Sequence, residues 1–149
     1  MVAFQNILFP VDLSESASKL SPYIKYVAEK FHARVHLLCV VQDLENYESF
    51  FVPHPSLEIF AEELKKGASK KLDHFLKEYM SDIPDVEYDA VLGDPAEEIV
   101  KYAKEHDIDM IVMGTHGRKG LDRLVFGSVA EKVVKMSPVP VLTLNPHKL

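Results

Sequence analysis

Short runs of branched apolar residues alternate along the chain with longer segments in which apolar residues recur every three or four positions. The runs have the length and composition of buried strands. They cover residues 7–11, 35–41, 86–92, 108–113 and 139–144. The longer segments have the periodicity of amphipathic helices, so the pattern predicts strands and helices in strict alternation.

The first helical segment contains an internal conflict at Pro22. Its apolar stripe extends from Ala17 to Phe31, but proline lacks a backbone N–H and is best accommodated in the first turn of a helix. We therefore expect the regular helix to begin near Ser21 and Pro22. The next helix, over residues 57–79, has an uninterrupted stripe and is expected to be the longest.

The ends of the last two helices are marked by capping residues. Asp94, Pro95 and Glu97 have the spacing of an N-cap, a first-turn proline and a capping box. The final helix is expected to open near Gly127 and Ser128, and to stop at Ser137 and Pro138. These signals supply boundaries that periodicity alone leaves open.

The alternation favours the α/β fold class, with a five-stranded, doubly wound parallel sheet. Near-continuous apolar strands are typical of parallel sheets covered on both sides, and right-handed crossovers place helices on both faces. The result is a Rossmann-like three-layer αβα sandwich. Because no repeat, low-complexity tract or linker interrupts residues 1–149, we expect a single domain. The long connection from Gln42 to Ser56 is interpreted as an ordinary loop, with a lid or a partner surface as the alternative.

Composition and charge exclude several classes of protein. With 47% hydrophobic and 27% charged residues, the chain has the balance of a folded globular protein. A net charge of -6 argues against sequence-independent binding of nucleic acid. No run approaches the roughly 18 apolar residues of a membrane helix, and no signal peptide is evident, so we expect a cytoplasmic protein. The single cysteine, Cys39, lies in an apolar run and is expected to be buried rather than reactive.

Ligands of doubly wound sheets bind beyond the carboxyl ends of the strands, so the strand exits are the first candidates for a site. The exit of the fourth strand is exceptional, because four of the six glycines lie within the 14 residues from Gly114 to Gly127. Glycine lets backbone N–H groups approach an anion, and Ser128 adds a hydroxyl at the positive end of a helix. This segment therefore predicts a phosphate-binding loop.

Three cations and a histidine lie in the same segment. Arg118, Lys119 and Arg123 supply positive charge in an otherwise acidic chain, as triphosphate binding requires, and a solvated basic loop is the alternative for each of them. His116 is a further candidate, with simple solvent exposure as its alternative. The other histidines lack the spacing of metal ligands, so we expect no metal site built from protein side chains.

The motif Gly114-x2-Gly117-x9-Gly127-Ser128 resembles the ATP-binding signature of the universal stress protein family. The likeness extends towards both ends of the chain: residues 7–15 resemble the family's first strand and acidic turn, and residues 137–142 resemble its last strand. It implies the strand order 3-2-1-4-5 and a nucleotide-dependent regulatory or stress-response module. The implied ligand is ATP, or ADP or AMP, with or without Mg2+.

The resemblance also implies which residues bind the nucleotide. Asp12 would bind the ribose hydroxyls, Val40 would pair with adenine through its backbone, and the base would lie against Pro10 and Val11. The phosphate side would be lined by Met113, Gly114, His116, Gly117, Arg118, Gly127, Ser128 and Val129. A carboxylate can accept two hydroxyl hydrogen bonds, although capping of the first helix is an equally good interpretation of Asp12.

Other nucleotide-binding motifs are missing. The turn after the first strand, residues 10–14, lacks the glycines and lysine of a Walker loop and the Gly-x-Gly-x-x-Gly of a dinucleotide site. Asp94 fits a helix cap better than the acidic pocket of a phospho-receiver domain. With no paired carboxylates for magnesium and no evident base, we expect a binding module, and a slow ATPase or nucleotide-transferring enzyme is the alternative.

Two further expectations concern the last strand and the glycines. In the implied order the last strand, from Val139 to Leu144, is an exposed edge, and family members join through this strand, so we expect a homodimer. The substitution Gly127→Val is expected to abolish nucleotide affinity and to spare the fold.

Overall fold

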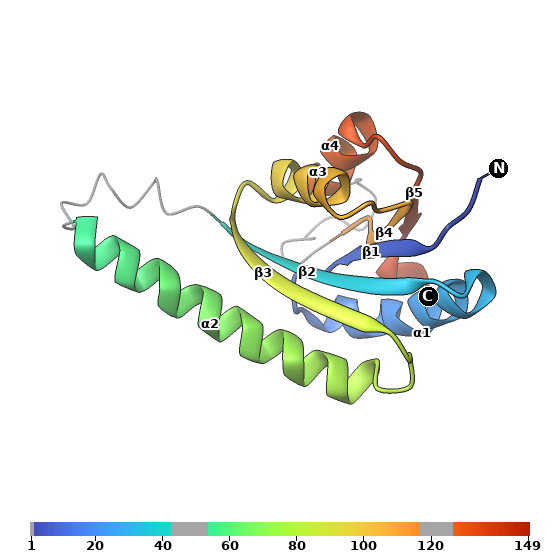
Figure 1. Cartoon of the computed structure of the whole chain (residues 1–149), viewed down its shortest axis with the longest axis horizontal. Coiled ribbons are helices and arrows are strands. Elements are labelled where there is room, and N and C mark those ends of the chain that lie inside the picture. Colours follow the sequence, from blue (N-terminus) through green and yellow to red (C-terminus); the bar gives the residue numbers. More distant parts are fainter. Residues whose placement is uncertain (1, 43–53, 117–126) are drawn as a thin grey trace.

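The protein is described by a computed structural model that covers residues 2–42, 54–116 and 127–149. Within these residues a parallel sheet has the order β3-β2-β1-β4-β5, as predicted (Figure 1). Its strands are β1 (Asn6–Pro10), β2 (Arg34–Gln42), β3 (Val86–Gly93), β4 (Met110–Gly114) and β5 (Val141–Leu144). Strands β3 and β5 are therefore the two edges of the sheet.

Helices cover both faces of the sheet, which confirms the predicted α/β, doubly wound architecture (Figure 1). Helices α1 (Glu15–Phe31) and α2 (His54–Tyr79) lie on one face. Helices α3 (Pro95–Glu105) and α4 (Ser128–Met136) lie on the other face, and a 3-10 helix, η2 (Pro146–Lys148), follows the last strand. The crossovers therefore change face between the two halves of the chain.

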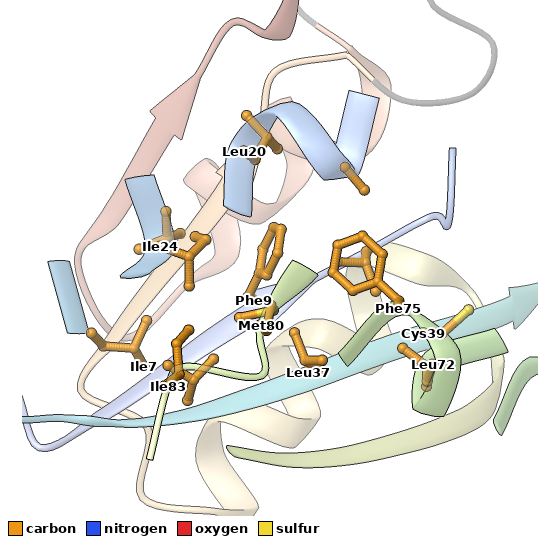
Figure 2. Close-up of a cluster of buried hydrophobic side chains, with 14 of the residues drawn as sticks. Ile7, Phe9, Leu20, Ile24, Leu37, Cys39, Leu72, Phe75, Met80 and Ile83 are labelled. Carbon is orange, nitrogen blue, oxygen red and sulfur yellow. The ribbon is translucent and has the colours of Figure 1, made fainter. Parts of the chain in front are cut away.

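Alternating side chains of the strands divide the apolar core in two. On β1, Ile7 and Phe9 pack towards α1 and α2, whereas Leu8 packs towards α3 and α4. Figure 2 shows the first of these cores, where Phe9 meets Phe75 of α2 with ring centroids 6.4 Å apart. Cys39 is buried in the same cluster, which confirms its interpretation as a small apolar residue. Both faces of the central strand are thus buried, as its unbroken apolar sequence predicts.

Helix α1 corrects the expectation that Pro22 marks a helix start. The helix begins at Glu15, and Pro22 lies inside it. In a regular helix the carbonyl of Ser18 would accept a hydrogen bond from the N–H of residue 22, which proline lacks. The buried Ser21 donates its hydroxyl to that carbonyl instead, at 2.8 Å. A side chain thus replaces the missing backbone donor, and this helps the helix continue through the proline.

Several other boundaries differ by a few residues from the sequence-based ones. Strand β4 begins at Met110 rather than at residue 108. Asp109, just before the strand, uses its side-chain carboxylate to accept hydrogen bonds from the N–H groups of Gln5 and Asn6. Strand β5 begins at Val141 rather than at residue 139. Pro140 precedes it and contributes its carbonyl, which accepts the N–H of Ile111 at 2.9 Å. Hydrogen bonds at the strand ends, which apolar periodicity does not report, set these limits.

The helical limits are closer to expectation at α3 and α4. Asp94 is the N-cap of α3 and accepts the N–H of Glu97 at 3.1 Å, with Pro95 in the first turn, as predicted. Helix α4 begins at Ser128 and ends before Pro138, also as predicted. Helix α2 begins at His54, so the expected connection from Gln42 to Ser56 is shorter than the sequence suggested. Residues 43–53 of that connection lie outside the described residues.

Within the part of the chain that the structure describes, no helix combines the length and the apolar character needed to cross a bilayer.

A buried polar cluster lies near the amino ends of the strands. His36 of β2 is buried, with Nδ1 3.1 Å from the hydroxyl of Tyr102 and Nε2 3.3 Å from Oδ1 of Asn6. Because the Asn6 oxygen can only accept, Nε2 carries the proton and Nδ1 accepts from Tyr102. The neutral imidazole therefore satisfies both of its ring nitrogens, and a second proton on Nδ1 would force the bond with Tyr102 to reverse, with the hydroxyl accepting instead of donating.

The surroundings of His36 favour this neutral form. Burial lowers the pKa of His36, against the opposing pull of Glu87, whose Oε2 lies 3.8 Å from Nδ1. The charges of His106 and Arg34 act in the same direction as burial. Burial also raises the pKa of Tyr102 to about 12, so its hydroxyl stays a donor over the whole physiological range.

Acidification is therefore expected to destabilise the fold through His36. As the pH falls through about 6.5, the usual histidine pKa, the unfolded chain takes up a proton that the folded chain resists. The free energy of unfolding should fall by up to about 1.4 kcal/mol per pH unit from this group. Urea unfolding between about pH 8 and pH 5 measures the slope.

The matched control for this experiment is the exposed His74. The variant His36→Gln should flatten the pH dependence whatever its own stability. The variant His74→Gln should alter the slope less, because that side chain is 79% exposed and its ion pair with Glu78 lies on the surface. An unaltered slope in His36→Gln would contradict the role given to the buried cluster.

Candidate functional site

The exit of β1 is built around Asp12. Strand β1 ends at Pro10, and the N–H of Val11 then donates to the carbonyl of Leu38 at 2.8 Å. Asp12 Oδ1 accepts the N–H of Ser14 at 3.0 Å and its hydroxyl at 2.6 Å. The N-cap of α1 is Ser14, so the capping interpretation of Asp12 is wrong, although its carboxylate does stabilise the turn that leads into the helix.

That turn carries local backbone strain. Leu13 has φ of 62°, in the left-handed region that a branched side chain rarely adopts. Such strain persists where the surrounding structure compensates for it, and it clusters at functional sites. Here the strained residue, Leu13, lies between Asp12 and Ser14, which are joined by the two hydrogen bonds that Ser14 donates to the Asp12 carboxylate.

The exit of β2 leaves backbone groups without a neighbouring strand. The last β1–β2 pair is Pro10 with Leu38, whereas β2 continues to Gln42 alongside β3. The N–H of Arg34 donates to Gln5 on the β1 side and that of Val35 donates to Asp85 on the β3 side. Because a parallel strand alternates its backbone groups between its two neighbours, the N–H and C=O of Val40 face the β1 side, beyond the point where β1 has ended.

The exit of β4 brings the two ends of the glycine segment together. The N–H of Gly127 donates to the carbonyl of Thr115 at 2.7 Å, and the N–H of Thr115 donates to Leu144 at 2.8 Å. A Cβ at Gly127 would lie 2.5 Å from that same Thr115 oxygen, which is too close for any real side chain. Glycine at 127 is therefore required by the fold itself.

This contact overturns the expectation that Gly127→Val would spare the fold. The added side chain would meet a backbone carbonyl rather than a flexible side chain, so the loop or the start of α4 would have to move. Loss of binding by that variant could not be assigned to the ligand alone.

Helix α4 presents its amino terminus at the same place. Gly127 is the N-cap and Ser128 the first helical residue, and among the described residues no side chain caps this end. The first N–H groups of a helix have no intrahelical acceptor, and the helix dipole places partial positive charge there. The arrangement is suited to an anion.

His116 is 8% exposed, so the alternative of a simply exposed loop histidine is wrong. Its Nδ1 lies 2.8 Å from the Thr115 hydroxyl, and its ring meets that of His147 edge-on with centroids 5.4 Å apart. Its Nε2 is buried and has no hydrogen-bond partner among the described residues.

A cavity of about 690 Å³ joins these three strand exits. Its volume falls within the range of small-molecule and cofactor sites. Ten of the twelve predicted site residues line it: Pro10, Val11, Asp12, Val40, Met113, Gly114, His116, Gly127, Ser128 and Val129. The other two, Gly117 and Arg118, lie outside the described residues, as do Lys119 and Arg123. The structure thus brings together every predicted site residue that it describes.

Sequence reasoning missed the parts of the cavity wall that come from three helices. Helix α1 contributes its first turns, helix α3 contributes Pro95 and Ile99, and helix α2 contributes five residues far in sequence from any strand exit: Glu63, Leu64, Gly67, Ala68 and Lys71. The apolar stripe of α2 indicated burial against the sheet and gave no sign of a ligand. One signal was available, because Gly67 interrupts a helix of otherwise good helix formers.

Among residues 2–42, 54–116 and 127–149, no three His, Cys, Asp or Glu side chains gather in a way that could hold a metal ion.

The fold and the cavity define the class of this protein: a doubly wound α/β fold with a ligand-sized cavity where the crossovers diverge. The model of the universal stress protein family matches residues 3–145. The chain belongs to the universal stress protein family.

Individual relatives are similar along nearly their whole length. Universal stress protein MJ0577 of Methanocaldococcus jannaschii is 31% identical over 156 aligned positions, which cover 97% of this chain and 96% of the relative. The solved structure of MJ0577 matches with a TM-score of 0.80 at 33% identity, covering 97% of each chain. That of UspA from Lactobacillus plantarum matches with a TM-score of 0.77 at 27% identity, covering 97% of this chain and all of the other.

Proposed function

We propose that this universal stress protein binds ATP, or a close adenine nucleotide, in the cavity at the carboxyl ends of β1, β2 and β4, and acts as a nucleotide-dependent regulatory or stress-response module. The observation that carries the proposal is the cavity itself, which collects every described residue of the ATP-binding pattern. The glycine motif, which resembles the family's ATP-binding signature, supports the choice of ligand.

The nucleoside end of the ligand lies at the exits of β1 and β2 in this proposal. An adenine edge needs one donor and one acceptor side by side, and the N–H and C=O of Val40 supply them on the side where β1 has ended. Pro10 and the buried Val11 give the base an apolar surface. Asp12, beside them, accepts the ribose hydroxyls.

The phosphate end lies at β4 and α4. The amino terminus of α4 offers backbone N–H groups and the positive end of a helix dipole, and the hydroxyl of Ser128 adds a donor. A site that holds phosphate with backbone groups needs few cationic side chains, which suits a chain of net charge -6. Arg118, inside the glycine motif, is proposed to supply added charge.

The chemistry of the described cavity favours binding over turnover. Phosphoryl transfer needs Mg2+ ligands, charge on the γ-phosphate and a positioned nucleophile. Asp12 and Glu63 line the cavity from different elements, and the Asp12 carboxylate is already bonded to Ser14. A slow ATPase or nucleotide-transferring enzyme on the same fold remains the second candidate.

Native purification separates these two candidates. We expect mass spectrometry of the intact protein to find ATP, ADP or AMP retained, and calorimetry on protein stripped of its nucleotide to show stoichiometric ATP binding. Phosphate release in the presence of Mg2+ should be far slower than about 1 per second, the lower range of ordinary enzymes. Turnover at or above that rate would favour the enzyme, and absence of binding at millimolar ATP would overturn the proposal.

The ribose role of Asp12 can be separated from its role in the turn. Asp12→Asn keeps an oxygen that can accept from Ser14 but removes the charge and one acceptor. Loss of hydrogen bonds to a charged group should weaken ATP binding by about tenfold or more. The same variant should bind 2′,3′-dideoxy-ATP as well as the parent does. An equal loss for both nucleotides, measured by calorimetry, would assign the effect to the turn.

We further propose that the protein forms a homodimer through the edge strand β5. Leu142 of this strand is 39% exposed, and unpaired backbone groups on an edge invite pairing with a second copy. Pairing of identical strands across a two-fold axis gives a closed dimer.

Light scattering at micromolar concentration tests this dimer. We expect the parent protein to be dimeric and Leu142→Glu to be monomeric, because a charged side chain on the edge strand opposes its burial in an interface. The control is Tyr88→Glu on the opposite edge strand β3, where the side chain is 41% exposed and the dimer should persist. A monomeric parent protein would contradict the proposed dimer.

A further inference from the structure

Helix α2 faces the cavity with a single stripe of its surface. The lining residues are numbers 63, 64, 67, 68 and 71, which follow the three- and four-residue spacing of one helical face. Gly67 stands at the centre of this stripe, flanked one turn away by Glu63 and Lys71. A side chain at position 67 would therefore point into the cavity.

The fold gives no reason for glycine at this position. Gly67 lies well inside the 26-residue helix α2, where glycine is less favourable than alanine because it gains backbone freedom in the unfolded chain. An added Cβ would meet no atom of the described residues within 4 Å. This is the opposite of Gly127, where a Cβ would lie 2.5 Å from a backbone oxygen. At Gly67, by contrast, no atom of another element in the described part of the chain occupies the position next to the backbone.

The empty space lies on the nucleoside side of the site. Helix α2 packs against β2 and β3, on the face of the sheet shared with α1. Helix α4, whose amino terminus is proposed to hold the phosphates, packs on the opposite face. The stripe around Gly67 therefore faces the exit of β2, where Val40 presents its backbone groups.

We propose that the missing side chain at Gly67 makes the space in which the base of the nucleotide lies, so that α2, an element outside the glycine signature, sets the width of the site. Gly67 is a positioning residue in this assignment, because it contributes no atom to recognition beyond its backbone. The base is held between the Val40 edge on the sheet and the stripe of α2. The inference rests on the proposed nucleotide function.

Two substitutions at Gly67 test this inference, one through the stability of the ligand-free protein and the other through its affinity for ATP. Gly67→Ala should raise the melting temperature of the ligand-free protein by about 2 to 4 °C, because alanine favours the helix and meets no neighbour. Gly67→Leu fills the space and should weaken ATP binding by at least about tenfold, as overpacking does. If Gly67 had only a structural role, Gly67→Ala would not raise the melting temperature while Gly67→Leu weakened ATP binding.

The matched control is Lys66→Leu, which adds the same side chain one position away, at an exposed residue that does not line the cavity. Calorimetry at about 0.15 M salt, where surface charge is screened, should give this control an ATP affinity within about twofold of the parent protein. Gly67→Leu should lose the same factor for AMP as for ATP, because the base is common to both.

The possible outcomes separate this inference from the proposed function. Normal ATP binding by Gly67→Leu would overturn the inference and leave the function in place. A loss confined to ATP, with AMP unaffected, would place the phosphates at α2 and also overturn it. A lower melting temperature for Gly67→Ala would show that the fold itself needs glycine there. Failure of the parent protein to bind any adenine nucleotide would remove both proposals.

Discussion

The structure depends on the divergence of two neighbouring crossovers. The chain leaves β1 towards the face that carries α1, and it leaves the adjacent β4 towards the opposite face, which carries α4. Because the two connections separate at this point, the carboxyl ends of the central strands open into a crevice instead of a packed surface. The cavity lies there, and its walls come from segments more than a hundred residues apart in sequence, such as Pro10 and Ser128.

The two ends of the sheet differ in how their polar groups are hydrogen-bonded. At the amino ends, the Asp109 carboxylate bonds the N–H groups that begin β1, and His36 is enclosed by Tyr102 and Asn6. At the carboxyl ends, β2 runs on beyond β1, and Val40 keeps its backbone groups directed at the space that β1 vacates. One end thus contributes to stability by satisfying polar groups internally, whereas the other leaves such groups facing the cavity.

Glycines of the cavity wall illustrate why a residue type alone does not reveal its role. Gly127 allows α4 to approach Thr115 so closely that a Cβ would collide with the carbonyl, and the close approach is a property of the fold. Gly67 has open space where its Cβ would be, and the fold alone gives no account of it. In the sequence, Gly127 belongs to a cluster of glycines, whereas Gly67 is an isolated glycine within a helix. The surroundings of each glycine, and not its identity, show whether close packing of the fold requires it.

The sequence by itself determined the alternation of strands and helices, the cap at Asp94, the start of α4 near Ser128 and the glycine-rich strand exit at Gly114, because these depend on local periodicity and turn chemistry. Family resemblance added the strand order. Tertiary structure alone decided that α1 continues through Pro22, that Gly127 is held against Thr115, and that α2 forms a wall of the cavity. Each of these depends on which atoms approach one another in space, whether one turn away at Ser21 or across many intervening residues at α2. Apolar periodicity records that a face is buried but not what it is buried against.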